Sequence, residues 1–193
     1  MSLVLASASP RRKELLDAAG IACDVRPVDV DETRLPDEPA DEYVRRVAAL
    51  KADRAAALWP DDTVLAADTA VRVGTDVLGK PRSAADAVAM LEALAGRAHE
   101  VLTGVAIRWP GGGARDFVER TAVTFRPLSP EDIAWYVATR EPMDKAGAYA
   151  IQGLGSRFAT RIEGSYANVV GLPVASVADV LEGLGATSLV TGA

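Results

Sequence analysis

The sequence predicts an α/β protein, and three patterns indicate this fold class. Residues 63–67 form a continuous apolar run, which is typical of a strand covered on both faces. Apolar residues recur with helical period over residues 40–59. Residues 101–109 and 117–125 alternate like two strands, and the Gly-rich turn at 110–113 joins them into a predicted hairpin.

The first third of the chain contains three further predicted elements. A short apolar strand is expected at residues 3–6, followed by a helix at 10–19 that Gly20 ends. Residues 22–30 have an extended pattern that runs into the acidic stretch at 29–32. The chain therefore begins with a strand, a helix and a second extended segment.

The chain after residue 80 is predicted to hold three more helices. Ser83 opens a helix that reaches residue 94, and Ser129 caps one that runs to about residue 139. Residues 144–173 are Gly-rich and irregular, as segments that form functional sites often are. A final helix is expected at 174–184, and residues 185–193 are predicted to be a flexible tail.

Size and composition indicate one soluble domain, with room for two lobes, over residues 1–193. The chain has 193 residues, no linker-like stretch, 49% hydrophobic residues and 25% charged residues. The longest apolar runs are too short to span a bilayer, and the N-terminus lacks the pattern of a signal peptide. We therefore expect a cytoplasmic protein. The single Cys23 excludes an internal disulfide and a multi-cysteine zinc site.

The net charge of −6 argues against a broad surface for duplex nucleic acid. Phosphate recognition would have to be local, and a cleft that gathers basic residues would suit a small phosphorylated metabolite.

Residues 6–13 place cations at the start of a predicted helix. Arg11 and Arg12 follow Ser7, Ser9 and Pro10 there, although a helix N-terminus disfavours positive charge by about 0.3 to 1 kcal/mol per cation. One interpretation is a cradle for a phosphate group, built from serine hydroxyls, backbone amides and guanidinium groups. The other is an ordinary helix start, with Ser9 as N-cap and solvated basic residues.

Three charged side chains are candidates for chemistry, each with a simpler explanation. Asp68 follows the apolar run 63–67, so it is expected at the carboxyl end of a buried strand, where α/β sheets bind ligands; alternatively it forms a turn. Lys51 lies on the inward stripe of the helix 40–59 and either points into a cleft or extends its ammonium to the surface. Glu32 is either a solvated loop residue or the partner of Asp68 in a magnesium site.

Two familiar catalytic motifs, a Walker A loop and a serine triad, are rejected. Residues 74–81 almost match a Walker A loop, but Pro81 replaces the required hydroxyl residue and no strong helix begins at Lys80, which is left as a possible point charge for phosphate. His99 is the only histidine and no serine lies in a GxSxG motif, so we expect a structural histidine. Acid–base chemistry would then fall to carboxylates and metal-bound water.

Five segments together give the chain a resemblance to the Maf family of nucleoside triphosphate pyrophosphatases. They are Ser-Ala-Ser-Pro-Arg-Arg at 7–12, Ala-Asp-Thr at 67–69, Gly-Lys-Pro at 79–81, Asp-Lys-Ala-Gly-Ala-Tyr-Ala-Ile-Gln-Gly at 144–153, and Gly-Ser-Tyr-Ala-Asn-Val-Val-Gly-Leu-Pro at 164–173. Residues 96–104 also resemble the family. Ala8, where many members have glycine, is a minor departure.

The resemblance implies a mixed, twisted sheet flanked by helices, like that of inosine triphosphatase, with a deep cleft between two lobes. It also implies a divalent metal, Mg²⁺ or alternatively Mn²⁺, and cleavage between the α and β phosphates that releases a nucleoside monophosphate and pyrophosphate. A homodimer is a further implication. The rival interpretation is a nucleotide-sensing or partner-binding module, linked to control of cell division, that does not hydrolyse its ligand.

Residue by residue, the resemblance makes Asp68 the proton acceptor and places Glu32, Lys51 and Lys80 at the other charged catalytic positions. Glu32 and Asp68 are the candidate metal ligands. The set expected to bind substrate is Ser7, Arg11, Arg12, Thr69 and Gln152. Thr69 and Gln152 resemble the branch of the family that acts on dTTP and UTP rather than the branch that acts on 7-methyl-GTP. A hydroxyl and an amide also suit the donor and acceptor edge of uracil or thymine.

Overall fold

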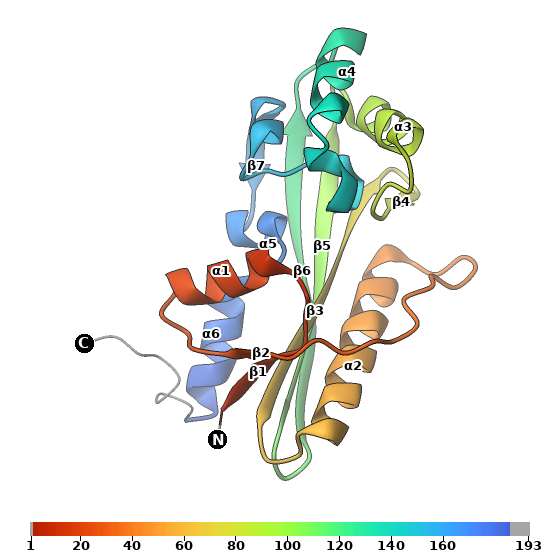
Figure 1. Ribbon diagram of the computed structural model, residues 1–193. Helices are drawn as coiled ribbons and strands as arrows, with labels where there is room; N and C mark the ends of the chain where they lie inside the picture. Colours follow the sequence, from red (N-terminus) through yellow and green to blue (C-terminus); the bar gives the residue numbers. More distant parts are fainter. Residues whose placement is uncertain (1, 186–193) are drawn as a thin grey trace. The chain divides into compact units, whose positions relative to one another are not determined.

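The computed structural model describes residues 2–185 and has a mixed α/β fold (Figure 1). Within these residues one sheet has the strand order β2-β1-β3-β5-β6-β7, and β4 pairs with β3 off this path. β1 pairs in parallel with β2 and with β3, whereas the β3–β4 and β6–β7 pairs are antiparallel. The predictions of an α/β fold and of a mixed sheet are therefore confirmed.

The elements have the following bounds. The strands are β1 (Leu3–Leu5), β2 (Asp24–Val25), β3 (Thr63–Val73), β4 (Asp76–Leu78), β5 (Ala98–Trp109), β6 (Gly113–Phe125) and β7 (Ala159–Glu163). The helices are α1 (Pro10–Ala18), α2 (Ala40–Leu58), α3 (Ala84–Leu94), α4 (Pro130–Ala138), α5 (Tyr166–Val170) and α6 (Val174–Gly183). Short 3-10 turns are η1 (Glu141–Asp144), η2 (Ala146–Ala148) and η3 (Leu154–Arg157).

The described chain divides into two compact units. The first comprises residues 2–68, 103–119 and 171–185, and the second comprises 69–102 and 120–170. The long strands β3, β5 and β6 each contribute residues to both units. The expected arrangement of one domain with two lobes and a deep cleft stays a prediction.

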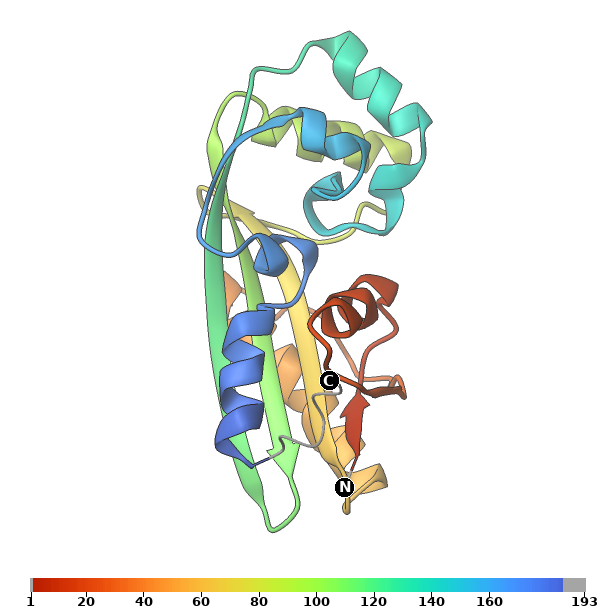
Figure 2. The ribbon, with the colours of Figure 1, turned by 90° about the vertical axis from the view of Figure 1, so that its left-hand side faces the viewer.

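The first unit has helices on both faces of its strands. Since successive residues of a strand point to opposite faces, β1 and β3 supply side chains to two separate cores. One core joins β1, β3 and β5 to α1 and α6, and the other joins the same strands to α2. Figure 2 views the side of α1 and α6, with α2 behind the strands.

Small residues let α2 lie close to the sheet. Its inward face presents Ala48, Ala52 and Ala55, all fully buried, to alanine and valine side chains of β1 and β3. A Cβ atom at Gly104 in β5 would lie 2.2 Å from the carbonyl oxygen of Val44, so only glycine fits there. This close approach brings the helix within reach of polar groups on β3.

The second unit combines helices and 3-10 turns. α3 contacts α4, η1 and η2, and Ser129 starts α4 with a complete capping box, as its sequence predicts. Aromatic rings pack edge-to-face within this unit, including Tyr136 of α4 against Phe158 with ring centroids 5.1 Å apart. His99 belongs to the same cluster and is 2% exposed, in agreement with a structural role.

The structure corrects several expected boundaries. β3 does not end before Asp68 but continues to Val73, so Asp68 lies within a strand rather than at its carboxyl end. β7 and α5 lie inside the segment 144–173, which was expected to be irregular, and the extended pattern at 22–30 yields only the two-residue β2. Beyond Gly185, the predicted tail falls outside the described residues. None of the described helices has the length and apolar character needed to cross a membrane.

Candidate active site

The start of α1 anchors one arginine inside the first unit. The Arg12 side chain is buried, its Nε donates to the carbonyl oxygen of Gly171 at 2.9 Å, and its Nη1 donates to Ser7 Oγ at 2.9 Å. Ser7 Oγ also accepts from the backbone N–H of Ser9 at 3.2 Å. Ser7 therefore closes the turn before α1 and orients the guanidinium of Arg12.

This geometry agrees with only part of the simpler interpretation of the N-terminal segment. Ser9 occupies the N-cap position and Pro10 the first helical position, but the Ser9 side chain makes no capping hydrogen bond. The first turn of α1 contains no acidic residue to offset its cations. Arg12 is buried rather than solvated, whereas Arg11 is partly exposed.

Lys51 connects two carboxylates in the same unit. Its Nζ lies 2.9 Å from Asp68 Oδ1 and 2.8 Å from Glu32 Oε1. The side chains of Lys51 and Asp68 are 10% and 11% exposed, whereas that of Glu32 is 52% exposed. Lys51 thus points inward from α2, and it brings together three of the four predicted catalytic residues.

Burial and charge act in opposite directions on this group. Burial raises the pKa of Asp68 above its ordinary value, against the charge and hydrogen bond of Lys51 and the charge of Arg12. Burial lowers the pKa of Arg12, although the carboxylates of Asp68 and Glu32 counter it. A carboxylate with a raised pKa and cations beside it is suited to accept a proton from a water molecule.

The remaining predicted site residues belong to the second unit. Thr69 follows Asp68 directly in β3 and is partly buried, while Lys80 and Gln152 are exposed. Lys80 lies between β4 and α3, four residues before α3 begins at Ala84, in agreement with the rejection of a Walker A loop. Their roles stay predictions.

Comparisons with known proteins identify the family. A family model described as Maf-like protein matches residues 2–184. The chain belongs to the Maf family. This confirms the resemblance that five separate segments of the sequence indicate.

Members of the Maf family with named activities are close in sequence. A relative from Anaeromyxobacter sp. (strain Fw109-5), named dTTP/UTP pyrophosphatase, is 58% identical over 187 residues, which cover 95% of this chain and 89% of the relative. A protein of the same name from Myxococcus xanthus (strain DK1622) is 51% identical over 183 residues, covering 95% and 92% of the two chains. Both comparisons span almost the whole chain.

A solved structure shares the fold. The Staphylococcus aureus Ham1 protein matches with a TM-score of 0.56 and 16% sequence identity, over 95% of this chain and 99% of that one. At this identity the likeness concerns the fold alone.

Two carboxylates of this Maf protein, Glu32 and Asp68, are the donors that could contribute to a divalent metal site. Among residues 2–185, no group of three or more His, Cys, Asp or Glu side chains could hold a metal ion. Glu32 and Asp68, however, approach one ammonium from two sides. Carboxylate oxygens of this kind suit a hard divalent cation that completes its coordination with other oxygen ligands.

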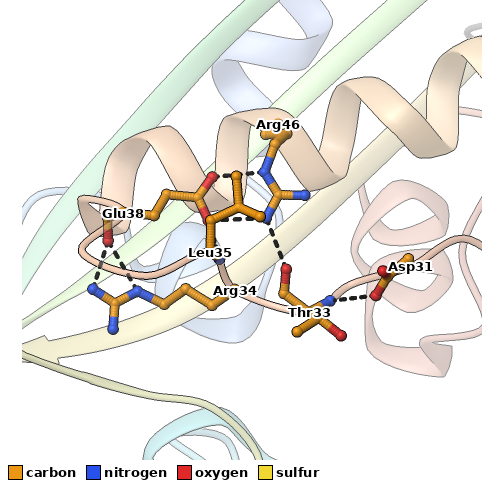
Figure 3. A network of polar contacts seen from close by, with 6 residues as sticks. All are labelled: Asp31, Thr33, Arg34, Leu35, Glu38 and Arg46. Atoms are coloured by element: carbon orange, nitrogen blue, oxygen red, sulfur yellow. Dashed lines mark hydrogen bonds and ion pairs between the residues drawn. The ribbon is translucent and has the colours of Figure 1, made fainter.

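A polar network that local sequence patterns do not reveal holds the acidic loop, defined as residues 29–37, against α2 (Figure 3). Arg46 donates to both carboxylate oxygens of Glu38, at 2.6 and 2.9 Å, and to the carbonyl oxygen of Thr33 at 3.0 Å. Glu38 also accepts from the N–H of Leu35 at 3.0 Å. Hydrogen bonding to Arg46 lowers the pKa of Glu38, which keeps the carboxylate ionised.

This network fixes the neighbour of a predicted catalytic residue. Thr33 follows Glu32 directly, so Arg46 holds the backbone of the acidic loop next to the side chain that pairs with Lys51. Arg46 and Lys51 both project from α2. In the sequence, Glu38 and Arg46 are simply an acid and a base eight residues apart. That spacing does not by itself indicate that the two side chains pair.

Proposed function

We propose that this protein hydrolyses dTTP and UTP to the nucleoside monophosphate and pyrophosphate. The observation that carries the proposal is the buried pair of Lys51 and Asp68, with Arg12 and Glu32 beside it, in a chain that is 58% identical to a dTTP/UTP pyrophosphatase. Clustered cations around one acid are what the hydrolysis of a polyanion requires.

In the proposed reaction, water attacks the α-phosphorus. A bond forms between the water oxygen and the α-phosphorus, and the bond to the oxygen bridging the α and β phosphates breaks. Pyrophosphate leaves with the electron pair of that bond, and Asp68 accepts the proton of the water. The raised pKa of Asp68 makes it a stronger base than an exposed aspartate.

Basic side chains supply the charge that the transition state needs. Arg12, oriented by Ser7, and its neighbour Arg11 contact phosphate oxygens, and Lys80 provides a further point charge. Lys51 holds the carboxylate of Asp68 in one orientation and moderates the repulsion between Asp68 and Glu32.

Glu32 and Asp68 would hold the divalent metal of the family, Mg²⁺ or alternatively Mn²⁺. When bound, such an ion neutralises phosphate charge and lowers the pKa of a coordinated water. Base choice falls to Thr69 and Gln152, whose hydroxyl and amide pair with uracil or thymine. We place the enzyme in the cytoplasm, with a homodimer as its assembly.

The test is an assay of monophosphate and pyrophosphate release from a panel of nucleoside triphosphates with Mg²⁺. We expect dTTP and UTP to be cleaved fastest, and Asp68→Asn to lower kcat by at least about a hundredfold. Asp61→Asn, which neutralises an exposed carboxylate just before β3, is the matched control and should keep full activity.

Two outcomes would contradict the proposal. Activity of Asp68→Asn within tenfold of the unmodified enzyme would exclude Asp68 as the proton acceptor. Tight binding of nucleotides without any release of pyrophosphate would instead indicate the sensing or partner-binding module.

A further inference from the structure

The segment that carries Gln152 is a tight turn. The N–H of Gly153 donates to the carbonyl oxygen of Ala150 at 3.2 Å, which places Ile151 and Gln152 at the two central positions. Ile151 is 7% exposed and anchors the turn, whereas Gln152 is exposed. The turn therefore presents the Gln152 side chain outward from a fixed base.

Two side chains hold this turn from both ends. The N–H of Ala150 donates to the hydroxyl of Tyr136 at 3.0 Å. The N–H groups of Leu154 and Gly155 donate to the two carboxylate oxygens of Glu141, each at 3.1 Å. The Tyr136 hydroxyl donates to Glu141 Oε1 at 2.7 Å and links the two ends.

Glu141 and Tyr136 are themselves firmly placed. The N–H of Glu141 donates to Thr139 Oγ1 at 3.2 Å, and its carbonyl oxygen accepts from Lys145 Nζ at 3.3 Å. Tyr136 is fully buried, with its ring packed edge-to-face on Phe158. Because packing and hydrogen bonds fix the two anchor residues, the bonds to them also fix the position of the turn.

Two glycines show how closely the turn approaches its anchors. A Cβ atom at Gly153 would lie 2.3 Å from Glu141 Oε2, and one at Gly155 would lie 2.7 Å from the Tyr136 hydroxyl. Any other residue at either position would push the backbone away from the carboxylate or the phenol. Glycine at both positions therefore leaves the space that these hydrogen bonds need.

The Glu141 carboxylate is suited to holding the turn because an ionised carboxylate only accepts hydrogen bonds. Burial alone would raise the pKa of Glu141, but the hydrogen bonds from Tyr136, Leu154 and Gly155 outweigh it and lower the pKa. The ionised carboxylate thus accepts all three hydrogen bonds at neutral pH.

We infer that Glu141 and Tyr136 are positioning residues for base selection, acting through Gln152. This inference rests on the proposed role of Gln152 in recognising the base. A glutamine amide offers both a donor and an acceptor, so in one orientation it pairs with uracil and in the other with cytosine. It discriminates between the two bases best when its backbone is held at a fixed position relative to the base, and the hydrogen bonds from Ala150, Leu154 and Gly155 to the two anchors fix that position.

The experiment compares kcat and KM for UTP and CTP in Glu141→Gln. The substituted amide keeps the shape of the side chain but brings an NH₂ group to a position where the turn offers only donors. We expect the ratio of kcat/KM for UTP over CTP to fall about tenfold, the equivalent of one lost hydrogen bond. The change should appear as a higher KM for UTP, with kcat within about threefold, because the chemistry is left intact.

Two companion variants separate positioning from loss of stability. Tyr136→Phe removes one anchor and leaves the hydrogen bonds that Leu154 and Gly155 donate to Glu141, so its selectivity should shift in the same direction by a smaller factor. Ser129→Ala removes the cap of α4, which destabilises the fold, and makes no contact with the turn. Ser129→Ala should lower the Tm and leave selectivity unchanged.

A readout independent of activity is hydrogen exchange of the amides in residues 150–155. Glu141→Gln should speed exchange there and leave the amides of β5 and β6 protected. Unchanged exchange, or a selectivity shift as large in Ser129→Ala as in Glu141→Gln, would overturn the inference.

The Gln152→Glu variant separates the positioning role of Glu141 from the proposed role of Gln152 in base recognition. If Gln152→Glu changes base preference and Glu141→Gln does not, the positioning role is wrong and the proposed role of Gln152 stands. If Gln152→Glu lowers turnover of all nucleotides equally, both ideas about base choice fail. Cleavage of dTTP and UTP by the unmodified enzyme would still support the proposed activity.

Discussion

Replacing Lys51 with Met tests whether the buried ion pair organises the first unit. The methionine side chain has a similar length and fills the same space on the inward face of α2, but it removes the positive charge between Asp68 and Glu32. Asp68 then stays buried with only the charge of Arg12 to compensate it. The variant therefore isolates the electrostatic part of the interaction.

The expected loss of folding stability follows from how deeply the two partners of Lys51, Asp68 and Glu32, are buried. Removing one member of a buried ion pair costs about 3 to 5 kcal/mol, and the nearby Arg12 moves the value to the lower end, about 3 kcal/mol at pH 7. The pair with the half-exposed Glu32 adds little, because water screens it. For a chain of this length, about 3 kcal/mol corresponds to a fall in Tm of roughly 6 to 12 °C.

The stability lost in Lys51→Met depends on pH, and the pKa of Asp68 sets the direction of that dependence. Without Lys51 the pKa of Asp68 rises further, and an acid with a raised folded-state pKa contributes stability that is present at low pH and lost as the pH rises through that pKa. The difference in Tm between Lys51→Met and the unmodified protein should therefore be large at pH 8 and shrink toward pH 4.

The assay is thermal denaturation followed by circular dichroism from pH 4 to 8. Lys13→Met, which removes a partly exposed lysine paired with the exposed Asp17, is the matched control and should leave the Tm nearly unchanged at every pH. The double variant Lys51→Met with Asp68→Asn should regain most of the lost stability, because no buried charge is left without its partner. A Lys51→Met difference that is negligible at pH 8, or that grows at low pH, would refute this account.

Three further predictions concern other parts of the molecule. Arg46→Lys cannot hold both oxygens of its carboxylate partner and the carbonyl of the acidic loop, so kcat should fall about tenfold with a small change in Tm. Burial lowers the pKa of His99 from 6.5 to about 4, so His99 contributes stability that is present above pH 6.5 and lost toward pH 4. In urea titrations, the free energy of unfolding of the His99→Gln variant should fall by about 3 kcal/mol less than that of the unmodified protein between pH 6.5 and pH 4. Equal falls in the two proteins would contradict this prediction. Gly104→Ala places a Cβ atom 2.2 Å from the carbonyl oxygen of Val44 and should cost about 3 kcal/mol in the same titrations, whereas Gly183→Ala, with open space around it, should be tolerated.

Local patterns predicted the elements well where one physical signal dominated. The helical period at 40–59 matches α2, and the serines at 83 and 129 are N-caps of α3 and α4, because capping and periodicity depend only on neighbours in sequence. The end of β3 was wrong by several residues. Asp68 and Thr69 interrupt the apolar run, yet pairing with β4 carries the strand on to Val73.

The residues of the candidate site were named from the sequence, but their contacts were not. Lys51 stood out as a charge on an apolar helical face, and Asp68 as an acid after a buried run. Nothing local could tell an ammonium at the surface from one 2.9 Å from a carboxylate. That distance depends on the alanines and on Gly104, which allow α2 to lie against the sheet.

By itself the sequence determined the α/β class, most of the helices and the family, because these follow from local periodicity and from short motifs in a specific order. Only the tertiary structure decided that Arg12 is buried against the carbonyl of Gly171, 159 residues away, and that Glu141 holds the turn bearing Gln152. The physical reason is that burial and hydrogen bonding between distant residues depend on how the whole chain packs, and no local pattern encodes that packing.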